Sequence, residues 1–147
     1  MNSNPKDSLN YSKAQLDDFS ENTILEVMPL KTEETASSKY VLIKHDYYSS
    51  DSDHGRDMLT CILSSLAESS FNPLIICLVD KGVLLLDDTN PLNKQMQMLV
   101  DKAEMVIVDE DSTFLYGIQT FENAKVSLQS FKSISEDIIY SSDILVL

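Results

Sequence analysis

Two aspartates, Asp109 and Asp111, have the clearest chemical potential in this sequence, because they directly follow the apolar run Met105–Val108. A carboxylate at the end of a buried strand can attack phosphorus as a nucleophile, and a neighbouring carboxylate can handle the proton of the leaving group. Carboxylate oxygens can also bind a divalent cation. One hypothesis for this stretch is therefore a hydrolase or a metal-binding protein that uses Asp109 and Asp111, and the alternative is an acidic surface loop.

The wider pattern gives that hypothesis limited support. The stretch 109–113 fits the D-x-D-x-T motif of haloacid-dehalogenase-type phosphatases, but those enzymes also need a lysine and further Mg²⁺ ligands, and only Lys125 and Lys132 follow. EF-hand spacing is absent, and three glycines are too few for a nucleotide-binding loop. No catalytic residue, metal ligand or cofactor is assigned from spacing, and the balance favours a protein without enzymatic activity.

Short apolar runs alternate with amphipathic segments along the chain. The runs predict strands, and the spacing of apolar residues between them predicts helices. This alternation predicts parallel strands with right-handed crossovers, and hence an α/β three-layer sandwich of flavodoxin-like appearance with a mostly parallel sheet of about five strands. The predicted strands are 40–43, 74–79, 105–108, 125–128 and 144–147, and the predicted helices are 55–68, 90–103 and a segment from about 130.

The loops that follow parallel strands emerge together at the carboxyl edge of the sheet, where ligands bind. The polar stretches 46–53, 80–82 and 109–117 are therefore expected to meet there. A small-molecule pocket among these loops, with the ligand unknown, is a further hypothesis. His54 can serve there as an acid or base, or can be a solvated residue at a helix start. The candidate site residues are Asp109, Asp111, Ser112, Tyr116, Lys81 and His54.

Composition divides the chain in two. Residues 1–39 are polar and bury too little apolar surface to offset the entropy of ordering, which predicts a largely disordered N-terminal segment and linker. Within it, 23–28 can form a short strand or docking segment. Residues 40–147 are expected to form the single α/β domain, since 147 residues are too few for two ordinary domains.

The charge of the chain excludes several kinds of partner. Its 24 acidic residues against 11 basic ones give a formal net charge of -13, which would repel nucleic acid and anionic lipid surfaces. No segment has the ~20 apolar residues of a membrane helix or the apolar core of a signal peptide. The sequence therefore predicts a cytoplasmic protein that binds neither nucleic acid nor membranes.

The two cysteines, Cys61 and Cys77, each lie within an apolar run and lack C-x-x-C spacing. Two cysteines are also too few for a disulfide framework. Both are expected to be buried, reduced thiols that fill space in the core.

Between residues 40 and 147 the order of segments resembles the DsrE/DsrF/DsrH-like family, and more closely the DsrE-like domain of YedF-type sulfurtransferase homologues. The segments that carry this likeness are YVLI at 40–43, SDxGRxML at 52–59, LVDKGV at 78–83, the strand at 105–108 with Tyr116-Gly117, and the closing helix and strand at 134–147. The resemblance implies a DsrE-like fold and an oligomer with itself or with protein partners.

The resemblance also implies a cysteine just after the third strand, where sulfur-relay members carry a persulfide. In this chain Asp109 and Ser112 align with that place, and their oxygen atoms cannot form a persulfide. The leading hypothesis is therefore a DsrE-like domain without the persulfide-carrying cysteine, which acts as a non-catalytic interaction or regulatory subunit related to sulfur-relay proteins.

Overall fold

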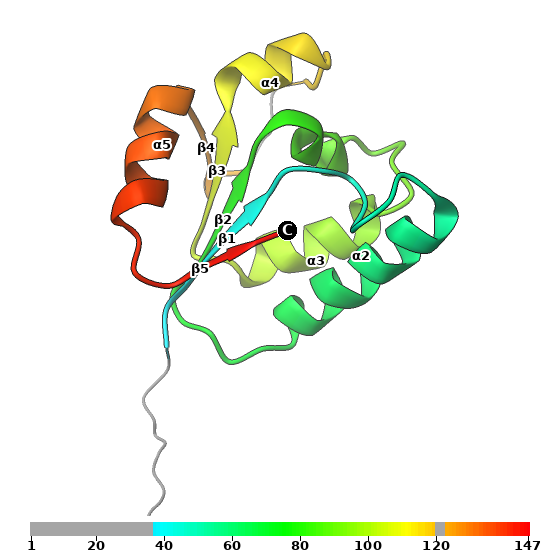
Figure 1. The fold of residues 1–147 in the computed structure, drawn as a ribbon, viewed down its shortest axis with the longest axis horizontal. Coiled ribbons are helices and arrows are strands. Elements are labelled where there is room, and N and C mark those ends of the chain that lie inside the picture. Colours follow the sequence, from blue (N-terminus) through cyan, green and yellow to red (C-terminus); the bar gives the residue numbers. More distant parts are fainter. Residues whose placement is uncertain (1–36, 120–122) are drawn as a thin grey trace, which may run out of the picture. The chain divides into compact units, whose positions relative to one another are not determined.

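Five short strands pair edge to edge in one sheet, and helices lie on both of its faces (Figure 1). The computed structural model describes residues 37–119 and 123–147. The strands are β1 (Lys39–Ile43), β2 (Leu74–Leu78), β3 (Met105–Asp109), β4 (Val126–Gln129) and β5 (Ile144–Val146). The helices are α2 (Asp53–Ala67), the 3₁₀ helix Asp80–Leu86, α3 (Asn93–Lys102), α4 (Glu110–Leu115) and α5 (Phe131–Tyr140).

The strand order is β4-β3-β2-β1-β5, and every neighbouring pair is parallel. Helices α2 and α3 lie on one side of this sheet and α5 on the other, while α4 lies beyond the end of β3 (Figure 1). The predicted three-layer α/β sandwich with a five-stranded parallel sheet is therefore confirmed. Residues 1–36 of the predicted N-terminal segment, including 23–28, lie outside the described residues, and Lys39, at its predicted end, already belongs to β1.

The two faces of the sheet are packed unequally. On the side of α2 and α3, leucines and valines of both helices and all three central strands form the larger cluster, with Leu59, Leu63 and Leu99 fully buried. On the side of α5, a smaller cluster surrounds Ile134, the buried residue of that helix, and includes Tyr40 and Cys77. Because both faces bury apolar side chains, the central strands read as continuous apolar runs.

The stretch 109–117 differs from the prediction, because it contains the short helix α4 where a loop was expected. Six residues are too few to show a helical period in sequence, and the helix depends on its cap. The side chain of Asp109 accepts a hydrogen bond from the backbone N–H of Ser112, which is the usual way to satisfy a first-turn donor. Within the described residues, no helix combines the length and the apolar composition needed to span a membrane.

Close approach of two backbone segments requires Gly82. A Cβ atom at this position would lie 2.2 Å from the carbonyl oxygen of Ile43, the last residue of β1. The absence of a side chain therefore lets the 3₁₀ helix after β2 lie against the end of β1, and thereby brings two of the three carboxyl-edge loops together.

We predict that Gly82→Ala lowers the free energy of unfolding by about 3 kcal/mol or more, because the nearest obstacle is backbone that cannot rotate away. Gly117→Ala is the matched control: Gly117 has φ +66 but open space around the new methyl, so about 1 kcal/mol is expected. Urea unfolding followed by circular dichroism measures both. Equal losses in the two variants would contradict the close approach at Gly82.

Candidate functional site

The carboxylate of Asp109 is the centre of the polar group at the carboxyl edge. It is 6% exposed, and its Oδ2 accepts two hydrogen bonds from Ser112, one from the backbone N–H at 3.2 Å and one from the hydroxyl at 2.5 Å. Asp109 ends β3 and caps α4, so one side chain links the sheet to the helix. The Oδ2 atom of Asp109 is therefore occupied by hydrogen bonds that stabilise the fold.

Ser112 extends this link to the neighbouring strand. While its hydroxyl donates to Asp109, the same oxygen accepts a hydrogen bond of 2.8 Å from the backbone N–H of Asp80, just after β2. Tyr116 adds a second bond, because its hydroxyl donates to Oδ1 of Asp80 at 3.0 Å. This hydrogen bond raises the pKa of Tyr116. Asp80 has φ 50, and the two bonds hold it in this left-handed conformation.

The structure thus brings together three of the six candidate residues, namely Asp109, Ser112 and Tyr116. Asp80, which was not among the candidates, is hydrogen-bonded to both Ser112 and Tyr116. Its only signal in the sequence was its place directly after a buried strand, because a hydrogen bond across 32 positions has no spacing pattern. The hydrogen bonds of this group include neither His54, which is exposed at the start of α2, nor Lys81, which is half-buried in the 3₁₀ helix.

The second aspartate of the D-x-D-x-T stretch lies apart from the first. Asp111 is exposed on α4, whereas Asp109 is buried at the end of the strand. Thr113 is also buried, and its hydroxyl donates to the carbonyl of Glu110 at 2.6 Å. Since successive helical residues point about 100° apart, neighbours at i and i+2 face different sides. The motif therefore does not present its two carboxylates to one substrate in this arrangement.

One oxygen of Asp109 remains without a hydrogen-bond partner among the described residues, although Oδ1 is buried. In residues 37–119 and 123–147, no group of three or more histidine, cysteine or acidic side chains is placed to hold a metal ion. The negative charge of Asp109 also acts on Cys77, as one of the lesser causes that raise the pKa of that thiol.

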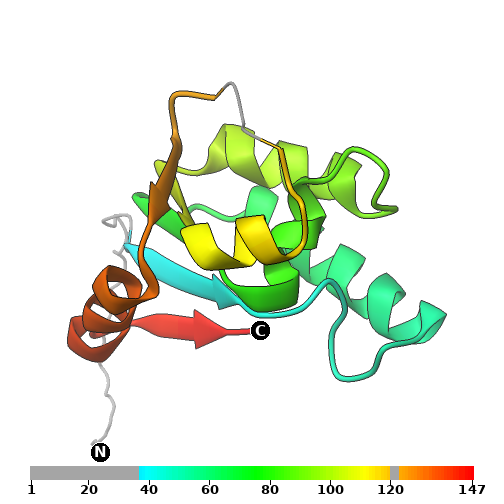
Figure 2. The ribbon, with the colours of Figure 1, turned by 90° about the horizontal axis from the view of Figure 1, so that it is seen from above.

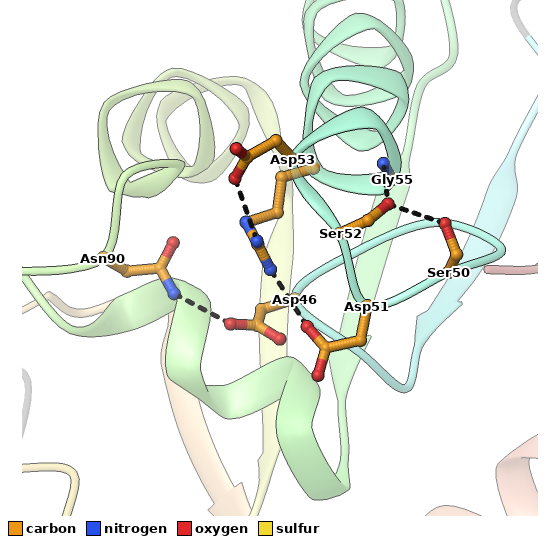
Figure 3. Close-up of polar contacts among 8 residues, drawn as sticks. Asp46, Ser50, Asp51, Ser52, Asp53, Gly55 and Asn90 are labelled. Atoms are coloured by element: carbon orange, nitrogen blue, oxygen red, sulfur yellow. Dashed lines mark hydrogen bonds and ion pairs between the residues drawn. The ribbon is translucent and has the colours of Figure 1, made fainter.

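The loop after β1 uses its acidic residues in contacts of its own (Figure 3). The amide of Asn90 donates to Oδ2 of Asp46 at 3.2 Å. Arg56 forms ion pairs with Asp53 and Asp51 at 3.1 and 3.0 Å, and these hydrogen bonds raise the pKa of the guanidinium. The three aspartates of this loop are thus engaged by cationic and amide donors from α2 and from the segment before α3.

The two cysteines differ, which corrects the expectation that both are buried. Cys77 is fully buried in β2, and burial is the main cause that raises its pKa to about 11. Cys61 is exposed, because it lies two positions from each of the buried residues Leu59 and Leu63 and so faces outward on α2. Its side chain lines an apolar groove of about 340 Å³ with neighbours that include Phe71 and Leu145.

Neither thiol follows β3, since Cys61 lies on α2 and Cys77 lies within β2. The hydroxyls of Ser112 and Tyr116 at this edge both donate to carboxylates, Ser112 to Asp109 and Tyr116 to Asp80. In chemical terms, the described part of this edge offers oxygen atoms that are already hydrogen-bonded, an exposed carboxylate pair on α4, and no soft nucleophile.

Comparisons with known proteins find similarity in fold. The solved structure of BT1422 from Bacteroides thetaiotaomicron, a conserved protein of unknown function, matches with a TM-score of 0.54 at 14% sequence identity, over 75% of this chain and 95% of that chain. The ychN protein from E. coli matches with a TM-score of 0.53 at 17% identity, over 75% and 99%. No family model matches the sequence, and no curated protein matches it.

We predict that Asp109→Ala lowers the free energy of unfolding by about 1–2 kcal/mol, because α4 loses its cap and Ser112 loses its acceptor. Asp109→Asn should cost less, since asparagine is also a good cap. Asp111→Ala provides the control two residues away and should change stability by less than about 0.5 kcal/mol. Chemical denaturation compares the three. A larger effect at Asp111 than at Asp109 would refute the structural role given to Asp109.

The cysteines give a second prediction. In the native protein at pH 8, an aromatic disulfide reagent should modify one thiol per chain, and Cys61→Ser should abolish this reaction, while Cys77 reacts only after unfolding. Because the pKa of Cys77 is raised from 9.0 to about 11, its contribution to stability is complete below pH 9 and is lost as pH rises through about 11.

The stability of the native protein should therefore fall more steeply between pH 9 and 11 than that of Cys77→Ala, as measured by urea unfolding at each pH. Equal slopes would show that Cys77 is not held in its neutral form by burial.

Proposed function

We propose that this chain is a DsrE-like domain that has lost persulfide chemistry and acts as a non-catalytic interaction or regulatory subunit related to sulfur-relay proteins. The resemblance of its segments to the DsrE/DsrF/DsrH-like family motivates the first part of the proposal, and the fold shared with the ychN protein is consistent with it. We expect it to work in the cytoplasm, in an oligomer with itself or with another protein.

One observation supports the proposed loss of persulfide chemistry. Asp109 and Ser112 occupy the place after the third strand where the resemblance calls for a persulfide-carrying cysteine, and they bond to each other and to Asp80. A persulfide carrier needs an ionisable sulfur with room for the incoming sulfur atom. Here the atoms are oxygen, they are buried, and their hydrogen bonds hold two loops together.

A second observation supports an interaction role. Directly after this group, α4 exposes Phe114 and Leu115 at 90% and 71%, which are among the most exposed large apolar side chains in the described residues. Adjacent apolar side chains left in water mark surfaces that another molecule covers. The place where a relay protein would react is, in this chain, next to a surface suited to contact.

Intact-mass measurement after incubation with a persulfide donor tests the proposal. We predict no stoichiometric addition of +32 Da, the mass of one sulfur atom, to the native chain, because Cys61 lies on α2, no thiol follows β3, and Cys77 is buried and neutral within β2. Cys61→Ser assigns any added mass, because an addition that persists in this variant lies on Cys77. Stoichiometric addition to Cys61 or Cys77 would overturn the proposal.

The rival function is a hydrolase or metal-binding protein that uses Asp109 and Asp111. Mg²⁺-dependent hydrolysis of a generic phosphoester, abolished by Asp109→Asn, would favour it. The separation of the two carboxylates, one buried at a cap and one exposed, gives no reason to expect such activity.

A further inference from the structure

Helix α4 has its polar and apolar sides reversed. Ser112 and Thr113 are buried, at 7% and 8% exposure, whereas Phe114 and Leu115 are exposed at 90% and 71%. A surface helix normally buries its apolar side and exposes its polar side. The reversal has a local cause, because the inward hydroxyls bond to Asp109 and to the carbonyl of Glu110.

The outward side of α4 combines apolar and acidic groups. At about 100° per residue, Glu110, Asp111, Phe114 and Leu115 fall within one arc, opposite the buried pair. Glu110 and Phe114 are four residues apart, as are Asp111 and Leu115, so each carboxylate lies one turn from an apolar side chain. Both carboxylates are exposed. We call these four residues the α4 surface.

The charges around the α4 surface argue against a second copy of this chain as its occupant. Among the described loops that follow β1 and β2, acidic residues outnumber basic ones, and Arg56 is already paired with two of them. Two copies that met at this edge would bring like charges together, in a chain with a formal net charge of -13. The acidic residues of these loops are Asp46, Asp51, Asp53, Asp80, Asp87 and Asp88, and the basic ones are Lys44, Arg56 and Lys81.

We propose that the α4 surface binds a lysine- or arginine-rich amphipathic segment of a partner protein. Phe114 and Leu115 would contact the apolar side of that segment, while Glu110 and Asp111 would pair with its cations. The acidic loops nearby would attract the same segment from a distance and speed its association. This inference rests on the proposed interaction function and names the chemical class of the partner.

The test uses the full chain and a fluorescently labelled, helix-forming peptide with leucine on one side and lysine on the other. We expect saturable binding that weakens as salt rises, and no binding of a matched peptide in which glutamate replaces every lysine. Phe114→Ser with Leu115→Ser should weaken binding at least about tenfold. Glu110→Gln with Asp111→Asn should reduce both the affinity and its salt dependence.

The matched control is Ile139→Ser with Tyr140→Ser, which removes another adjacent apolar pair, exposed at 71% and 85% on α5. This variant should bind the lysine peptide as the native chain does. Equal weakening in the two pairs of variants would show that general hydrophobicity accounts for binding and would overturn the proposal. Absence of binding by the native chain, or equal binding of the glutamate peptide, would also overturn it.

Sedimentation of the chain alone tests whether a second copy of the chain occupies the α4 surface. Self-association that Phe114→Ser with Leu115→Ser removes would assign the α4 surface to a second copy and so refute the basic partner. The proposed function is tested independently by the mass experiment: persulfide loading would refute that function, whereas failure of the peptide to bind without persulfide loading would refute only this partner class.

Discussion

The hydrogen bonds between Asp109 and Ser112 determine how the chain leaves the third strand, and much of the carboxyl edge follows from them. They end β3, start α4 and, through the Ser112 oxygen, hold the backbone of Asp80 after β2. Figure 2, which views the molecule from above, shows α4 beside the 3₁₀ helix that follows β2. A helix fixed in this position must turn its hydroxyls toward the sheet, so its two apolar residues are left outside.

This arrangement is consistent with elementary energetics. An unpaired polar group buried at the end of a sheet costs about 1–3 kcal/mol, and the hydroxyls of Ser112 and Thr113 avoid that cost by finding partners. Replacing them by apolar side chains would bury more hydrocarbon but leave the N–H of Asp80 without its acceptor. The inward side of the short helix is therefore used to form hydrogen bonds with buried polar groups. Phe114 and Leu115 are exposed as a consequence.

The sequence predicted those features that depend on local pattern. Strands β1, β2 and β3 lie within a residue of their predicted bounds, because valine and isoleucine in unbroken runs indicate strands covered on both faces. Helix α4 was not predicted, because six residues are too few to show a helical period in the sequence. Cys61 was assigned to the core from its apolar neighbours, although a helix turns part of any apolar run outward. The hydrogen bonds of Asp80 with Ser112 and Tyr116 form only in the tertiary structure, so the spacing of these residues in the sequence does not predict them.

The bridge from Ser112 to Asp80 also bears on how such a domain can evolve. Sulfur is a larger atom and a weaker acceptor than oxygen, so a thiol at position 112 would hold the left-handed turn at Asp80 less well. A lineage that relies on this oxygen would have to rebuild the turn after β2 before a cysteine could replace Ser112. The residue at position 112 is therefore coupled to the conformation of a second loop, and the two cannot change independently.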